Sequence, residues 1–183
     1  MLMEDIKRSL AAEGVIVEID TEKGLLHIPE KVLFPSGSAD FAPGGEKSLQ
    51  ALGKTLAKHL LCYSGAKGDP HPPACPQGKY FPGRLEAVLI EGHTDNVPIK
   101  NAQFADNWQL SAERSLKTFR YLTEHQYDLD KLFNAKQEPF LGVSAYGEQR
   151  PIGDNRTDEG KSANRRIALR FILAAPEIQA IVK

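Results

Sequence analysis

Short apolar segments of strand length alternate along this chain with longer segments that have helical periodicity. The apolar runs at 85–90 and 167–173 are far shorter than the roughly 20 apolar residues that span a bilayer, and turn or polar residues bound them. Leucines spaced on one helical face predict a helix over 47–61, and a similar pattern predicts another over 111–126. This alternation predicts an α/β two-layer sandwich.

The N-terminal part of the chain predicts a helix followed by a hairpin. Ile6 and Leu10 lie one helical turn apart among charged residues, as on a short amphipathic helix. Alternating apolar residues follow at 15–19, and after a turn a second apolar run ends at Pro29, a pattern typical of a β-hairpin. We therefore expect a lead-in helix or linker over 1–14, before the hairpin.

One domain accounts for nearly the whole chain. We expect it to cover 15–175, with a C-terminal tail at 176–183. Proline and glycine are frequent in 63–84, which we interpret as an inserted surface loop. The charges of 155–166 alternate in sign, and on composition alone this segment is interpreted as a solvated turn.

The charge balance excludes two classes of protein. The chain has 23 Lys and Arg against 24 Asp and Glu, a formal net charge of -1, and 41% of its residues are hydrophobic. A strongly basic nucleic-acid binder and a disordered polyelectrolyte would both differ from this composition. We expect a folded domain with no nucleic-acid partner.

Segment 91–114 holds the most informative polar residues. Asp95 follows a buried strand, and Arg114 lies early in the next predicted helix, whose N-cap we assign to Ser111. A carboxylate and a guanidinium placed in this way suit a zwitterion, because Asp95 would accept from an ammonium and Arg114 would bind a carboxylate through two parallel hydrogen bonds. The alternatives are an ion pair between the two residues, or an Arg114 that is simply solvated.

An enzyme is the competing functional class. His93, Asp95 and Ser111 are the residue types of a hydrolytic triad, and His93 with Asp95 could begin a metal site. The chain contains no nucleophile elbow, Walker loop or HExxH motif. We expect no catalytic residue and no cofactor. A purely structural domain with an empty pocket is the third possibility.

Several collinear motifs resemble the signature of the OmpA C-terminal-like family of peptidoglycan-binding domains. They are EGHTDNVPI at 91–99, NWQLSAER at 107–114, YGE at 146–148, and the segment from Asn155 to Arg166. The similarity extends over about 15–173. Within the family, FPSGSA at 34–39, VPI at 97–99 and NW at 107–108 are most similar to the MotB branch, the stator subunits of proton-driven rotary motors.

The resemblance implies a βαβαβ mixed sheet with helices on one face. It also implies binding of the diaminopimelate-containing stem peptide of peptidoglycan, without cleavage. By position, Asp95 matches the aspartate that binds the ligand's ammonium, and Arg114 matches the arginine that binds its carboxylate. The residues that match positions shaping or supporting the pocket are Thr94, Asn107, Leu110 and Arg165.

Location and partners follow from the same resemblance. It implies a periplasmic domain tethered to the inner membrane by an N-terminal transmembrane helix outside this sequence, with a MotA-like channel subunit as that region's partner. The insertion at 63–84 is foreign to the family pattern, so both a flagellar motor and another MotB-type motor, such as that of the Zorya anti-phage system, stay open. An outer-membrane protein or lipoprotein tether is the alternative. Because one weak site anchors poorly, we expect a homodimer.

Cys62 and Cys75 admit two interpretations. In the periplasm a disulfide between them is favoured, and it would tie down the insertion and contribute roughly 3 kcal/mol. The alternative is a zinc site made of the two cysteines with His59 and His71, whose ligand types are suitable but whose spacing is unfamiliar.

Overall fold

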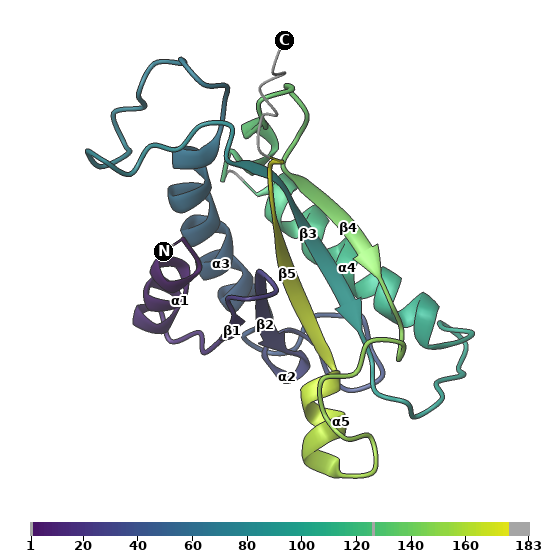
Figure 1. Ribbon diagram of the computed structural model, residues 1–183. Coiled ribbons are helices and arrows are strands. Elements are labelled where there is room, and N and C mark those ends of the chain that lie inside the picture. Colours follow the sequence, from purple (N-terminus) through teal and green to yellow (C-terminus); the bar gives the residue numbers. More distant parts are fainter. Residues whose placement is uncertain (1, 126, 176–183) are drawn as a thin grey trace.

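The computed structural model describes residues 2–125 and 127–175, which form helices packed on one sheet (Figure 1). The elements in chain order are α1 (Leu2–Ala12), β1 (Glu18–Asp20), β2 (Leu25–Pro29), α2 (Glu30–Leu33), α3 (Gly45–Leu60), the 3-10 helix η1 (Leu61–Tyr63), β3 (Leu85–His93), α4 (Asn107–Glu124), the 3-10 helix η2 (Leu129–Lys131), β4 (Leu141–Ala145), α5 (Asp158–Asn164) and β5 (Arg166–Leu173). The predicted C-terminal tail at 176–183 lies outside the described residues.

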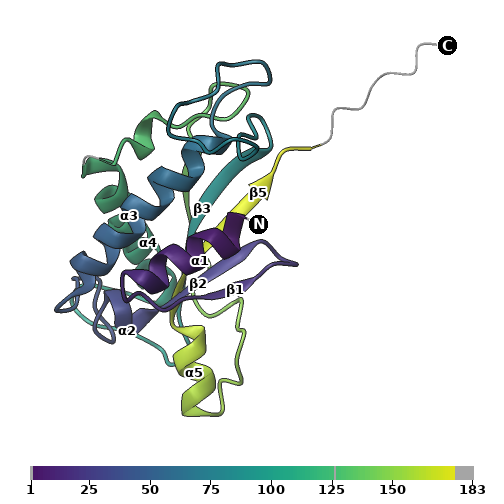
Figure 2. The same cartoon turned by 90° about the vertical axis from the view of Figure 1, so that its left-hand side faces the viewer.

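The sheet is mixed, as predicted. Its strand order is β1-β2-β5-β3-β4, in which β3 and β4 are parallel and every other neighbouring pair is antiparallel. The long helices α3 and α4 lie on one side of it (Figure 2). This arrangement confirms the predicted α/β sandwich. Within the described residues, none of the helices combines the length and the apolarity that crossing a bilayer needs.

The core lies between the sheet and the long helices. Helix α1 belongs to it, because Met3, Ile6 and Leu10 are buried and α1 packs against α3. The predicted hairpin forms, with Ile19 opposite Leu26, and Pro29 ends its second strand, but its first strand covers only Glu18–Asp20 and not the whole alternating segment at 15–19. The central apolar residues of β3 and β5 that fill this core are Leu85, Val88, Ile90, Ile167, Leu169 and Phe171.

Two predictions of local structure are wrong. Helix α4 begins at Asn107, one turn before Ser111, because the Asp106 carboxylate accepts from the Gln109 N–H at 2.8 Å and caps the helix there. Segment 155–166 contains helix α5 rather than only a turn. Its N-cap is Thr157, whose hydroxyl accepts from the Gly160 N–H at 3.0 Å. Polar caps, not apolar periodicity, mark both helix starts.

Gly92 allows the end of β3 to touch α4. A Cβ atom built on Gly92 would lie 2.0 Å from the Ser111 carbonyl oxygen, far inside contact distance. The two backbones therefore meet at this point, next to the loop that begins at Thr94. This close approach fixes the position of the 94–97 loop relative to the N-terminal turns of α4.

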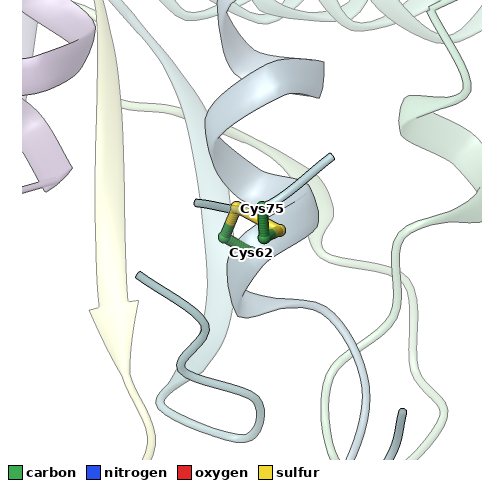
Figure 3. Close-up of a disulfide and its surroundings, with 2 residues drawn as sticks. All are labelled: Cys62 and Cys75. Atoms are coloured by element: carbon green, nitrogen blue, oxygen red, sulfur yellow. A yellow bond between two sulfur atoms is a disulfide. The ribbon is translucent and has the colours of Figure 1, made fainter. Parts of the chain in front are cut away.

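The insertion at 63–84 is held by a disulfide and by backbone contacts. Cys62 in η1 is bonded to Cys75, with their Cα atoms 5.5 Å apart (Figure 3). The Phe81 N–H donates to the Cys62 carbonyl at 2.7 Å, which returns the loop to η1. The zinc alternative is therefore wrong, because both thiols form the bridge, and within 2–125 and 127–175 no cluster of His, Cys, Asp and Glu is arranged to hold a metal ion.

Candidate functional site

Asp95 lies on the loop after β3, and both of its carboxylate oxygens have partners. Oδ1 accepts from the Val97 N–H at 3.0 Å, which closes a local turn. Oδ2 accepts from Arg165 Nη1 at 2.6 Å. The Asp95 side chain is 9% exposed and that of Arg165 is 29% exposed, so this ion pair reaches the surface through the arginine.

Arg114 projects from α4 into the protein, and only 2% of its side chain is exposed. Nε donates to the Ser38 carbonyl at 2.7 Å and Nη2 donates to the Pro35 carbonyl at 3.0 Å. The guanidinium also lies over the ring of Phe34, 5.4 Å from its centroid. The alternative of a simply solvated Arg114 is therefore wrong.

Glu30, at the start of α2, joins the two halves of the site. One of its carboxylate oxygens contacts Arg114 Nη2, and the other lies 2.8 Å from Arg165 Nε. Asp95, Arg165, Glu30 and Arg114 thus form a chain of alternating charges, which we call the charge network. Asp95 and Arg114 belong to one network without pairing directly, so the alternative of a simple ion pair between them is wrong as well.

Burial and ion pairing have opposite effects on the pKa values of the two arginines in the charge network. Burial lowers the pKa of Arg114, and the adjacent Glu30 carboxylate acts in the opposite direction. For Arg165 burial also acts to lower the pKa, but the hydrogen bond to Asp95 and the charge of Glu30 outweigh it and the pKa is raised. Two carboxylates and two guanidiniums leave the network with no net charge, which limits the cost of burying it.

The charge network still has unused hydrogen-bond donors. Among the described residues, neither Arg114 Nη1 nor Arg165 Nη2 has a hydrogen-bond partner. Asp95 Oδ1 accepts one hydrogen bond, although a carboxylate oxygen can accept two. Acceptors for an ammonium and donors for a carboxylate are therefore both present.

The other predicted site residues shape the loop that carries Asp95. The Thr94 hydroxyl donates to the Asp95 carbonyl at 2.9 Å. The Asn107 amide donates to the carbonyls of Asp95 at 3.3 Å and Val97 at 3.0 Å. Leu110 is buried in a small apolar cluster that contains Ala39 and Phe104 and packs against Ile99. These contacts hold the loop that carries Asp95 against the start of α4.

A surface hollow of about 270 Å³ lies beside the charge network. The hollow is adjacent to the network because two of its lining residues, Ala39 and Asp40, directly follow Ser38, whose carbonyl accepts a hydrogen bond from Arg114. The four network residues do not line it. Its lining comes from Ala39, Asp40, Gln103, Phe104, Gln109, Glu113 and Lys117.

Glu30 is the functional residue that sequence reasoning missed. It lies far along the chain from both arginines, and its signal is weak: a single acid between two short apolar runs, directly after Pro29 and before Lys31. A Glu that is 6% exposed needs a cationic partner, so the apolar surroundings were the available clue.

The hydrolytic triad does not form. The Ser111 hydroxyl donates to the Trp108 carbonyl at 2.9 Å and accepts from the Gly147 N–H at 3.0 Å. The His93 ring lies 3.4 Å from a Glu91 carboxylate oxygen, and burial lowers the pKa of His93. Asp95 is engaged by Arg165 instead. These three residues have separate partners and separate structural roles.

Comparison with known proteins identifies the class. The model of the OmpA family matches residues 79–165, which contain Asp95, Arg114 and Arg165. This part of the chain belongs to the OmpA family. Domains of this family bind peptidoglycan without catalysing a reaction, which confirms the prediction of a non-catalytic domain.

MotB proteins are among the named relatives. Motility protein B of Bacillus subtilis is 42% identical over 85 residues, which are 46% of this chain and 30% of that protein. A MotB-like protein of Desulfovibrio vulgaris superposes with a TM-score of 0.66 at 25% identity, covering 94% of this chain and 91% of that structure. The cell wall anchor of the type VI secretion system of Pseudomonas aeruginosa has the same fold, with a TM-score of 0.63 at 21% identity over 96% of this chain and 98% of that structure.

The match to curated relatives is partial. The aligned region spans 30% of the Bacillus protein and 54% of a Helicobacter pylori motility protein B. The resemblance to the MotB branch is therefore supported for this domain only. The match does not extend to the remaining parts of the longer proteins.

Proposed function

We propose that this domain anchors a MotB-like stator to the cell wall by binding the diaminopimelate residue of a peptidoglycan stem peptide. The observation that carries the proposal is the charge network, which places Asp95 and Arg114 in one electrostatic unit within the region that matches the OmpA family. A periplasmic domain of an inner-membrane motor, flagellar or anti-phage, would use such a site to hold its stator in place.

The ligand's zwitterion fits the groups of the network once Arg165 moves away from Asp95. Its ammonium would bind Asp95 by taking the place of Arg165 Nη1, which now lies 2.6 Å from Oδ2. Arg165 is the most exposed member of the network, so its Nη1 can leave Asp95 while its Nε stays paired with Glu30. The carboxylate would then be bound by Arg114 Nη1 and the released Arg165 in charge-assisted hydrogen bonds.

Affinity decides how such a domain works. Two charge-assisted contacts of roughly 1.5–3 kcal/mol each supply roughly 3–6 kcal/mol in total, so even before the cost of association is subtracted one stem peptide would bind no more tightly than tens of micromolar. Linking two copies on one polymer would raise the avidity by about 10²–10⁴-fold. The proposal therefore includes a homodimer joined outside this site, with the MotA-like channel subunit bound by the region upstream.

Sedimentation with purified sacculi tests the binding proposal. Asp95→Asn keeps the oxygen that accepts from the Val97 N–H but removes the negative charge, so the fraction of protein that sediments should fall at least about tenfold, the equivalent of one charge-assisted contact. Asp130→Asn, an exposed aspartate in η2, is the matched control and should sediment like the wild type. Equal sedimentation of Asp95→Asn and wild type would contradict the proposal.

A further inference from the structure

The N-terminal turn of α4 carries an exposed aromatic residue next to the charge network. Trp108 is the chain's single tryptophan, and 46% of its surface is exposed. Tryptophan is highly buried in most folded proteins because it is large and mostly apolar. Val97, on the loop that carries Asp95, is 51% exposed. Two apolar side chains thus remain uncovered beside a polar site.

The position of Trp108 is fixed by the residues on both sides of it. The preceding Asn107 donates to the carbonyls of Asp95 and Val97, and the Trp108 carbonyl accepts from the Ser111 hydroxyl at 2.9 Å. The Trp108 Cδ1 atom would lie only 3.5 Å from a Cβ on Gly147, so the indole lies against the turn after β4. The indole is therefore held on a helix and not on a free loop.

A rigid, exposed indole can bind a flat apolar surface at a small cost in conformational entropy. The charged end of a stem peptide offers no such surface, but the C–H face of a pyranose ring does. Two residues and the side chain of diaminopimelate separate its terminal zwitterion from the sugar, and together they span more than the roughly 7 Å of two extended residues. The indole of Trp108 lies against Gly147, whose carbonyl accepts from the Thr94 N–H at 2.9 Å, so Trp108 is adjacent to the loop that carries Asp95.

We infer that Trp108 stacks on a sugar ring of peptidoglycan, so that the domain prefers stem peptides attached to glycan over free peptides. This inference rests on the proposed function, because the charge network must hold the peptide for the indole to meet the sugar. It assigns the two chemical halves of peptidoglycan to two parts of the site: the peptide to the charge network and the glycan to Trp108.

Tryptophan fluorescence tests the inference, since the signal has a single source. We expect the disaccharide-linked tripeptide to shift the emission of the wild type to shorter wavelength, and the free tripeptide to bind without that shift. Trp108→Ala should weaken binding of the linked tripeptide about tenfold, measured by calorimetry, and leave binding of the free tripeptide within twofold. Trp108→Phe should restore part of the loss.

Ile16→Ala is the matched control, because Ile16 is 69% exposed and lies before β1, away from α4. It should bind both ligands like the wild type. An equal loss for both ligands in Trp108→Ala, or equal affinity of the wild type for the two ligands, would overturn the inference while leaving the proposed function intact. A wild-type protein that binds neither ligand would overturn both.

Discussion

Replacing Arg114 by methionine should abolish sacculus binding and lower the free energy of unfolding by about 3 kcal/mol, because the change removes one partner of a buried ion pair. Glu30 would then face Arg165 alone, and the carbonyls of Pro35 and Ser38 would lose their donor. Urea denaturation measures the loss of stability, and sedimentation with sacculi measures the loss of binding.

A double variant separates these two effects. Arg114→Met combined with Glu30→Gln removes both charges, so no buried carboxylate is left without its Arg114 partner. We expect it to recover at least part of the lost stability while still failing to bind, because replacing a buried pair by uncharged groups is often close to neutral. Arg114→Met protein that binds sacculi normally, or a double variant that regains binding, would show that Arg114 does not contact the ligand.

Gly92→Ala should destabilise the domain by about 3 kcal/mol, because the new methyl group would meet a backbone carbonyl that cannot move away. The Cβ would lie 2.0 Å from the Ser111 oxygen, so β3 and α4 would have to separate. For a domain of this size such a loss corresponds to a fall in melting temperature of roughly 6–12 °C, measured by circular dichroism.

Gly142→Ala is the control for Gly92→Ala. Gly142 lies in the neighbouring strand β4, where an added Cβ would lie 2.9 Å from the terminal Leu89 Cδ2 atom. A side-chain end can rotate away, so the melting temperature should fall by only a few degrees. If the two glycine variants melted at the same temperature, the contact between β3 and α4 would not be the rigid support of the Asp95 loop.

Local patterns were sufficient to predict most of the sheet and the long helices. Alternation and apolar runs mark β2, β3 and β5, since one or both faces of each strand are buried. Helix α5 has no such pattern. It is held by the Thr157 cap and by Asn164, whose side chain bonds to the backbone of Ile152 and Gly153. Polar contacts between distant positions leave no periodic signal in the sequence.

The candidate site, too, could be predicted only in part from the sequence. Asp95, Arg114 and Arg165 could be assigned because they lie in motifs of the OmpA family, and the structure brings all three into one network. Their arrangement could not be predicted, because Glu30 determines it and comes from a different part of the chain. The start of α4 was predicted one turn late, although Asp106 followed by Gln109 matches a capping-box pattern.

Calorimetric titration with two soluble muropeptides tests the central claim most directly. One carries diaminopimelate at the third position and the other carries lysine, which has the ammonium but lacks the second carboxylate. If Asp95 and the two arginines recognise a zwitterion, the lysine form should bind at least about tenfold more weakly, because it loses a charge-assisted contact to the guanidiniums. Equal affinity for the two muropeptides would contradict the account.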